Sequence, residues 1–457
     1  MKDTITAIAT PPGEGGIAII RISGKDALAI ARKLFYSATW LQELPVAQKV
    51  MFGEIRDPET EQCVDQVLLT FFKAPKSYTA EDVIEISSHG GTWVVSIILK
   101  LVLQQGARLA EPGEFTRRAF VNGRLDLTQA EAVADVIDSA SDKALSSAIS
   151  QLKGGLSLRL NILYESLLNA QAQLEASIDF TEDGLTFQSR EDTQKQIQEV
   201  EANLTKLVHS FRQGKIYREG MRVTLIGKPN VGKSSLLNAL LQEDRAIVTP
   251  HAGTTRDTLE ERVRIKDIHI IITDSAGLRE NPDIIEEEGI ERTRAALESS
   301  DLAIVVFDSS KPLDDNDKLL MNEVDGNPKL IVINKSDLQA SWPPSEIKSF
   351  LAGELAISLS AKTLEGFDSL KEALHQKAIG GERSSESLVI TRERHRDHLQ
   401  QAVKALQKTS ESLTDGLSEE LIAVDITLAM EHLGAVLGKT FEEDLLDKIF
   451  GQFCIGK

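Results

Sequence analysis

Three patterns of hydrophobic and polar residues follow one another along the chain. Over residues 1 to about 120, the apolar runs "GIAIIRISG" and "DQVLLTFF" are typical of strands, whereas "TWVVSIILKLVLQQGA" predicts a helix that closes at Gly106. From "LDLTQAEAVADVIDSASDKAL" to about residue 218, apolar residues recur at steps of three and four, which predicts long helices with one apolar face. The residues on this face are Leu127, Ala130, Val133, Ile137 and Ala140.

The third pattern begins near Met221 and is an alternation of short apolar strands with helical segments. The strands are "RVTLIG", "HIIIT", "DLAIVVFD" and "KLIVIN", and such an alternation predicts a mainly parallel sheet covered by helices. A polar Gly/Ser stretch, "IGGERSSES", interrupts it near residue 380. The helical pattern then returns from "TRERHRDHLQQAVKALQ" to the end of the chain.

These boundaries predict a multidomain α/β protein with an inserted domain. We expect an α+β N-terminal domain over residues 1–119 and an α/β domain over residues 219–380. Because helical segments flank the α/β part on both sides, residues 120–218 and 381–457 are expected to form one discontinuous helical domain.

Composition adds limits to this picture. A chain of 457 residues suggests about three domains, and 41% hydrophobic with 26% charged residues is typical of a globular protein. There is no apolar run long enough for a membrane helix and no signal-peptide pattern, so we expect a cytoplasmic protein. Two cysteines agree with a reducing compartment. The net charge of −19 argues against wide, non-specific binding of nucleic acid.

The strongest chemical signal is "GKPNVGKSS", from Gly227 to Ser235, directly after the strand "RVTLI". It matches the phosphate-binding P-loop in the required strand-to-helix setting. Gly227 and Gly232 allow backbone N–H groups to face the phosphates, Lys233 brings a positive charge, and Ser234 offers a hydroxyl to Mg²⁺.

Partner motifs follow in the order that a guanine-specific site needs. "DSAG" at Asp274–Gly277 can support Mg²⁺ and sense a γ-phosphate, and Thr255 is the candidate second Mg²⁺ ligand. In "NKSD", the carboxylate of Asp337 can accept two hydrogen bonds from guanine but not from adenine. "SAK" at Ser360–Lys362 would complete the base pocket through backbone contacts. We therefore predict that residues 219–380 form a Ras-like P-loop GTPase domain that binds GTP and Mg²⁺.

The predicted nucleotide-binding residues come from these motifs and from the "TPHAGTTRD" segment between them. They are Asn230, Val231, Gly232, Lys233, Ser234, Ser235, Thr249, Thr254, Thr255, Asp274, Gly277, Asn334, Lys335, Asp337, Ser360, Ala361 and Lys362.

The residue that orients the attacking water is not obvious from the motifs. Many GTPases have a glutamine where this chain has Leu278, which cannot hydrogen-bond to water. Asn230 in the P-loop could hold a cation near the phosphates, and the acidic stretch "DIIEEEGIE" follows Leu278. On composition alone that stretch is more typical of a solvated helix start, and spacing leaves Glu286, Glu287 and Glu288 open.

Several long blocks together resemble the MnmE (TrmE) family of tRNA-modification GTPases over essentially the full length. Besides the P-loop with Asn230, they include "GTTRD", "DSAGL", "ATPPGEGGIAIIRISG", "SYTAEDVIEISSHGG", "PGEFTRRAFVNGRLDLTQAEAV" and the terminal "FCIGK". Ser275 replaces the threonine that is commoner in "DTAGL".

The resemblance implies a homodimer formed through the N-terminal domain, which binds a tetrahydrofolate derivative (5-formyl- or 5,10-methylene-tetrahydrofolate). It implies a partner, the FAD protein MnmG, with which the family installs a 5-carboxymethylaminomethyl or aminomethyl group on the wobble uridine of certain tRNAs. It further implies that G domains dimerise across GTP with K⁺. The alternatives from the residues are a regulatory GTPase of ribosome or RNA assembly and a GTP-sensing scaffold.

The resemblance also assigns roles to single residues. It implies that Glu286 orients water and that the folate contacts are Arg21, Glu81, Arg124 and Lys457, with arginine at 124 where relatives often have lysine. The implied K⁺ ligands are the Asn230 side chain and the backbone carbonyls of Thr249, His251 and Thr254.

The C-terminal "FCIGK" places one of the two cysteines, Cys454, beside the chain end. A lipidation box fits poorly because Gly456 is not aliphatic and Lys457 is not a usual last residue. A frayed end is the simple alternative. If Phe450 and Phe453 anchor the tail by burial, the resemblance implies that Lys457 and Cys454 lie beside the one-carbon unit of folate, with Cys454 as a candidate nucleophile; a tail that only docks stays open.

Overall fold

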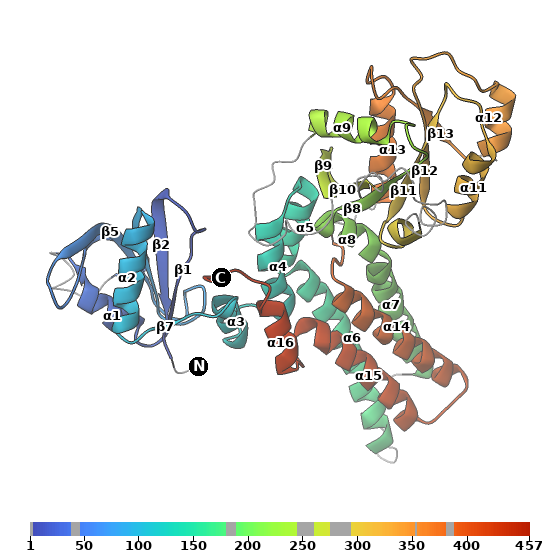
Figure 1. Cartoon of the computed structure of the whole chain (residues 1–457). Coiled ribbons are helices and arrows are strands. Elements are labelled where there is room, and N and C mark those ends of the chain that lie inside the picture. The colour runs from blue at the N-terminus through green and yellow to red at the C-terminus, as the bar shows by residue number, and fades with distance from the viewer. Residues whose placement is uncertain are drawn as a thin grey trace. The chain divides into compact units, whose positions relative to one another are not determined.

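The computed structural model describes residues 3–37, 46–179, 189–244, 260–274, 294–351, 354–380 and 388–457 (Figure 1). The chain divides into two compact units. The first comprises Met1–Ala134, Gln151–Glu201 and Gln401–Lys457, and the second comprises Asp135–Ser150 and Ala202–Gln400. This division does not test the domain bounds predicted from the sequence, so the bounds 1–119, 120–218, 219–380 and 381–457 stay a prediction.

The first unit contains a largely antiparallel sheet of seven strands in the order β3-β4-β5-β6-β2-β1-β7, counted among the described residues. Only β1 and β7 pair in parallel. One face buries an aliphatic core with α1 (Ala27–Leu34) and α2 (Thr92–Gln104), which ends just before Gly106 as predicted. The strands are β1 (Ile5–Ile8), β2 (Gly15–Ser23), β3 (Phe35–Tyr36), β4 (Val50–Arg56), β5 (Cys63–Phe72), β6 (Val83–Gly90) and β7 (Arg108–Leu109).

The described chain is mainly helical from Glu114 to Glu219 and again from Glu393 to Phe450, as the pattern predicts. In the first unit, α6 packs against α15, and α16 packs against α3 (Figure 1). The helices are α3 (Glu114–Val121), α4 (Leu127–Asp138), α5 (Asp142–Leu152), α6 (Gly155–Asp179), α7 (Arg190–His209), α14 (Glu393–Thr414), α15 (Glu419–Leu437) and α16 (Glu443–Phe450).

The predicted apolar face along α4 is wrong in its second half. Leu127, Ala130 and Val133 are buried, but Ile137 is 41% exposed and Ala140 lies beyond the helix end. The physical reason is a helix boundary: the Ser141 hydroxyl accepts a hydrogen bond from the Ala144 N–H at 3.1 Å, which caps the start of α5. The periodic pattern therefore continues past the end of α4 at Asp138, and Ala140 lies in the link before α5.

The second unit holds the predicted mainly parallel sheet, in the order β13-β12-β11-β8-β10-β9, with only β9 antiparallel among the described strands. Every residue of β11 is buried, and alternate side chains enter two separate apolar clusters, so helices cover both faces. The strands are β8 (Met221–Ile226), β9 (Glu260–Ile265), β10 (Ile268–Asp274), β11 (Leu302–Asp308), β12 (Lys329–Asn334) and β13 (Ala356–Ser358). The helices are α8 (Phe211–Glu219), α9 (Lys233–Asp244), α11 (Asp315–Glu323), α12 (Pro344–Leu351) and α13 (Phe367–Ile379).

Among the helices that the structure describes, none combines the length and the apolar content needed to span a bilayer.

Candidate functional site

The P-loop turns from the end of β8 into the start of α9, as the motif predicts. Gly232 has φ +99°, and a Cβ at this position would lie 2.2 Å from the Asn334 amide nitrogen, so only glycine fits. The Lys233 ammonium donates hydrogen bonds to the carbonyls of Gly227 (2.7 Å) and Lys228 (2.9 Å). Ser234 and Ser235 follow in the first turn of α9. The loop thus forms the tight backbone cradle that phosphate binding requires.

Asn334, the last residue of β12, joins three of the predicted motifs. Its side chain is buried, and its amide N–H₂ donates to the Val231 carbonyl at 2.9 Å. Its amide oxygen accepts hydrogen bonds from the backbone N–H of Lys335 at 2.8 Å and of Ala361 at 3.0 Å. The P-loop, "NKSD" and "SAK" are therefore brought together by one side chain.

Asp337 and Ser360 form the second link within the predicted base pocket. The Ser360 hydroxyl donates to the Asp337 carboxylate at 2.6 Å and accepts from the N–H groups of Lys362 (3.3 Å) and Thr363 (3.2 Å). Because Ser360 is fully buried, the carboxylate has a fixed neighbour that restricts its orientation. The structure thus brings Asp337 and "SAK" together, as the predicted base pocket requires.

Motif spacing alone missed Lys228 as part of the P-loop framework. Its ammonium pairs with Asp314 at 2.6 Å and Asp317 at 2.8 Å, at the start of α11. Burial by itself lowers the pKa of Lys228, but hydrogen bonds to these two carboxylates outweigh it and hold the pKa above its usual value. The acidic stretch "DDND" after β11 was the signal that could have suggested this tether.

Part of the predicted catalytic machinery lies outside the described residues. This holds for Thr249, His251, Thr254, Thr255, Ser275, Gly277, Leu278 and the three glutamates Glu286, Glu287 and Glu288. Asp274 ends β10, and its backbone is in register with Leu225 of β8, beside the strand that leads into the P-loop.

A second group of predicted residues gathers around Tyr78 in the first unit. The Arg21 guanidinium lies 5.4 Å and the Arg124 guanidinium 5.1 Å from the centre of the Tyr78 ring. Arg124 also donates to the Tyr78 carbonyl at 2.8 Å, and Arg21 pairs with Glu85 at 2.8 Å. Two predicted folate contacts are thus brought together as cations on one aromatic side chain.

Glu81, the predicted acidic folate contact, belongs to an ion network around a buried arginine, Arg118. It accepts hydrogen bonds from the Ser23 hydroxyl at 2.7 Å and from Arg118 at 3.2 Å. Arg118 is 1% exposed and also pairs with Glu114 and Asp3, each at 2.9 Å. Sequence reasoning missed Arg118, although "GEFTRRAF" contains it, because nothing in the pattern shows which arginine is buried.

The C-terminal tail packs against the rest of the first unit. The predicted burial of Phe450 and Phe453 is confirmed, and the alternative of a frayed chain end is wrong. Both rings enter an apolar cluster with Phe120 and the start of α4. The Gly456 carbonyl accepts a hydrogen bond from Arg21 at 3.2 Å, and the Lys457 carbonyl accepts one from the Phe115 N–H at 3.1 Å.

Gly456 is required by this docking because its φ is +96° and a Cβ would lie 2.4 Å from the Ile8 carbonyl oxygen. The chain end is therefore held beside Arg21. Cys454 is an exposed free thiol near this position.

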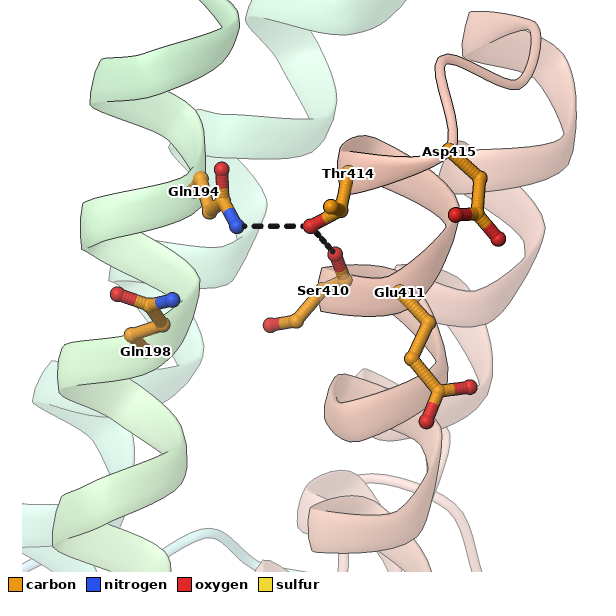
Figure 2. A pocket seen from close by; sticks show the side chains of 6 residues that line it. All are labelled: Gln194, Gln198, Ser410, Glu411, Thr414 and Asp415. Atoms are coloured by element: carbon orange, nitrogen blue, oxygen red, sulfur yellow. Dashed lines mark hydrogen bonds between the residues drawn. The ribbon is translucent and has the colours of Figure 1, made fainter.

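A separate open cavity of about 330 Å³ lies between α7 and α14 and contains none of the predicted site residues (Figure 2). Its lining mixes amide, hydroxyl and carboxylate groups, and the Gln194 amide donates to the Thr414 hydroxyl across it at 3.1 Å. The lining residues are Gln194, Gln198, Ser410, Glu411, Thr414 and Asp415.

Comparison with known proteins identifies the family of the chain. The family model described as "GTP-binding protein TrmE N-terminus" matches residues 4–124, and the "MnmE helical domain" model matches residues 127–454. The curated protein "tRNA modification GTPase MnmE" of Syntrophus aciditrophicus is 45% identical over 459 residues, covering 100% of both chains. That of Enterococcus faecalis is 42% identical over 458 residues, covering 100% of this chain and 98% of the relative.

Among solved structures, the chain is similar to the G domain of the FeoB iron transporter of T. maritima, with 29% sequence identity and a TM-score of 0.27. That similarity covers 35% of this chain and 98% of the other chain, and a TM-score this low does not establish a common fold.

The P-loop cradle and the base pocket on a mainly parallel sheet define a P-loop GTPase embedded in a larger α-helical and α+β framework. Together with relatives above 40% identity over the full length, they place the protein more narrowly: the chain belongs to the MnmE family of tRNA modification GTPases.

Proposed function

We propose that this chain hydrolyses GTP with Mg²⁺ and K⁺ and uses the cycle to drive modification of the wobble uridine of certain tRNAs. The observation that carries the GTP part is the Asn334 amide, which joins the P-loop to both guanine-recognition motifs. Family membership supports the tRNA part.

In this proposal each motif has a defined task. The backbone N–H groups around Gly232 and the Lys233 ammonium bind the phosphates, and the Ser234 hydroxyl, with Thr255, binds Mg²⁺. Asp337 accepts two hydrogen bonds from guanine. The Asn230 side chain and the carbonyls of Thr249, His251 and Thr254 bind K⁺, which offsets negative charge where many GTPases use an arginine. Glu286 orients the water in place of the missing glutamine.

The experiment is GTP hydrolysis by the full-length protein in K⁺ and in Na⁺, with wild type and Glu286→Ala. We expect faster turnover in K⁺ and loss of most of it in Glu286→Ala at unchanged GDP affinity. Equal rates in both salts would contradict the K⁺ role, and a fully active Glu286→Ala would contradict the assignment of the water-orienting residue.

Asp337→Asn should shift preference from guanine to xanthine nucleotides in a competition assay.

We further propose that the group around Tyr78 binds a tetrahydrofolate derivative. Arg21, Arg124 and the Tyr78 ring form a cationic and aromatic surface that suits an aromatic, carboxylate-bearing ligand. The docked tail holds Gly456, the residue before Lys457, against Arg21, which supports Lys457 as a further contact. When bound, the folate derivative would supply the one-carbon unit of the modification. Calorimetric titration with 5-formyl-tetrahydrofolate tests this, and absence of binding would favour the alternative, a GTPase of ribosome or RNA assembly.

We propose that Cys454 takes part in the chemistry as a nucleophile. Support comes from its exposed thiol on a tail that is held beside Arg21. A strain lacking this protein would be complemented with wild type or Cys454→Ser, and modified wobble uridine would be quantified by mass spectrometry. Loss of modification with retained GTP turnover is the expected result, whereas normal modification would reduce the tail to a docking element.

We also propose a homodimer through the N-terminal domain and an MnmG-type FAD protein as partner in the cytoplasm. An apolar strip on the sheet face away from the core supports the dimer: Phe52 (63% exposed) stands opposite Leu68 (44% exposed) on paired strands, next to Val50 (62% exposed). Light scattering should find a dimer for wild type and a monomer for Phe52→Asp. A dimeric Phe52→Asp would contradict this interface.

Co-purification with an MnmG-type protein in the presence of GTP tests the partner. Because the net charge of this chain is −19, the partner would supply most of the RNA-binding charge, with local basic stretches such as "TRERHRDH" contributing.

A further inference from the structure

β11 ends in Asp308, a carboxylate that belongs to none of the recognised GTP-binding motifs. Its side chain is 3% exposed. It accepts hydrogen bonds from the backbone N–H of Ser310 at 3.0 Å and from the Ser310 hydroxyl at 2.6 Å. The Lys335 ammonium donates to its other oxygen at 2.5 Å. A buried carboxylate with one cationic partner is therefore fixed at the carboxyl end of the central strand, where ligands of such sheets bind.

Lys335 joins this carboxylate to the P-loop. Its ammonium also donates to the carbonyl of Asn230 at 2.9 Å, so one group contacts both Asp308 and the phosphate-binding loop. The Lys335 backbone is itself restrained, because its φ is +66° and its carbonyl accepts a hydrogen bond from the Ser309 hydroxyl at 3.0 Å. The contacts run from β11 through Lys335 to the loop.

The end point of this chain of contacts is a residue in an unusual conformation. Asn230 has φ +64°, in the left-handed region that non-glycine residues adopt mainly when the surroundings hold them there. The ammonium on its carbonyl is one such restraint. The direction of the Asn230 side chain follows from this backbone conformation, and that side chain is the proposed K⁺ ligand.

We propose that Asp308 is a positioning residue for the GTP reaction: it fixes the Lys335 ammonium and, through it, the P-loop backbone at Asn230. The part of this inference that concerns Lys335 depends on the proposed GTP site. The expected change in K⁺ requirement depends on the proposed K⁺-dependent hydrolysis. Asp308 itself does not have to touch the nucleotide.

Electrostatics explains why a carboxylate is needed here. In a partly buried site an ammonium with no anionic neighbour moves toward water, and the attraction of a hydrogen-bonded carboxylate opposes that movement. Burial by itself raises the pKa of Asp308, but the hydrogen bonds from Lys335 and Ser310 outweigh it and hold the pKa below its usual value, so the carboxylate is charged at neutral pH. An amide of the same shape would keep both Ser310 contacts but lose the charge.

The test uses the full-length protein with Asp308→Asn, with Asp308→Glu as the variant that restores the charge, and with Asp301→Asn as the matched control. Asp301 lies just before the opposite end of β11, and its carboxylate accepts a hydrogen bond from the backbone N–H of Arg222 at 2.8 Å. The control therefore also replaces a hydrogen-bonded aspartate by asparagine, but at a position far along the strand from the nucleotide motifs. The readouts are the dissociation constant of a fluorescent GDP analogue and the K⁺ concentration that gives half-maximal GTP hydrolysis.

We expect Asp308→Asn to weaken GDP binding about ten-fold, the size of one lost charged hydrogen bond, and to raise the half-saturating K⁺ concentration several-fold. Asp308→Glu should recover part of both effects, and Asp301→Asn should match wild type. A merely structural role of Asp308 would lower the melting temperature of Asp308→Asn without moving its K⁺ requirement.

Unchanged GDP affinity in a folded Asp308→Asn would overturn the proposal. Weakened GDP binding with an unchanged K⁺ requirement would contradict the step through Asn230. If wild type shows no K⁺ stimulation at all, the proposed K⁺-dependent hydrolysis fails, while the GDP affinities still decide the role of Asp308 at Lys335.

Discussion

The GTP site and the tail site differ in how far apart in the chain their residues lie. In the GTP site, consecutive parallel strands deliver their motifs to one edge of a sheet, and the Asn334 contact with Val231 spans 103 positions. At the tail, Arg21 contacts Gly456 across 435 positions, and no repeated pattern connects the two. The first site is thus an outcome of a regular architecture, whereas the second depends on how the chain end packs.

The two sites also use charge differently. The P-loop relies mainly on backbone groups and on two lysines that contact them, Lys233 and Lys335, and Lys335 also pairs with the buried Asp308. The region beside the tail site is organised by a guanidinium with 1% exposure, Arg118, that neutralises carboxylates from three different segments. Removing a partner from such a network leaves buried charges without compensation, so this region should be the more sensitive of the two to a single substitution.

The largest expected effect tests this difference. Arg118→Met should destabilise the N-terminal part by about 3–5 kcal/mol, because Glu81 and Glu114 lose a buried cation. Hydrogen exchange of peptides from β6 and α3 at increasing urea would measure it. Arg56→Met is the control: its pair with Glu54 is 42% exposed on the arginine side, so it should cost under about 1 kcal/mol. Equal losses in the two variants would contradict the comparison.

A smaller effect is expected from the same substitution at one glycine of each site. In both Gly232→Ala and Gly456→Ala, a Cβ is added to a residue whose backbone has a positive φ. The new Cβ also comes too close to a neighbouring atom, the Asn334 amide nitrogen in the first variant and the Ile8 carbonyl oxygen in the second. Each substitution should therefore cost about 1–3 kcal/mol. Gly232→Ala should weaken GDP binding about ten-fold or more and leave the tail docked. Gly456→Ala should speed hydrogen exchange at the Phe115 amide, which donates to the Lys457 carbonyl, and leave GDP binding intact.

Two measurements on both variants, GDP affinity and exchange of a peptide containing Phe115, separate the sites. Loss of GDP binding in Gly456→Ala would show that the tail and the nucleotide site are energetically coupled rather than independent.

The smallest expected effect concerns pH. Burial raises the pKa of Glu114, but its hydrogen bonds with Arg108, with the Glu111 N–H and with Arg118 outweigh it, so the folded-state pKa is below the unfolded one. Its stabilisation is therefore present above the unfolded pKa and is lost as pH falls through the folded value. Arg108→Met should be less stable than wild type at pH 7 by about 1 kcal/mol, and the difference should shrink below about pH 4. A difference that grows on acidification would contradict this account.

The amino-acid sequence determined the fold class, the element types and the GTP-site motifs, because these depend on short-range patterns. An all-buried parallel strand such as β11 requires a continuous apolar run, and a P-loop requires glycine at fixed spacing. Where local signals compete, the pattern was wrong: the apolar periodicity continued through Ala140, but α4 ends at Asp138 and Ser141 caps the start of the next helix.

Only the tertiary structure decided which charged residues are partners. In sequence Arg117 and Arg118 are neighbours of the same type, yet Arg118 alone is buried with Glu81 and Glu114, because adjacent helix positions point about 100° apart. The same applies to Asp308, whose role depends on a lysine 27 positions away, and to a chain end that finds Arg21. Long-range pairing is set by the packing of whole elements, which no local pattern records.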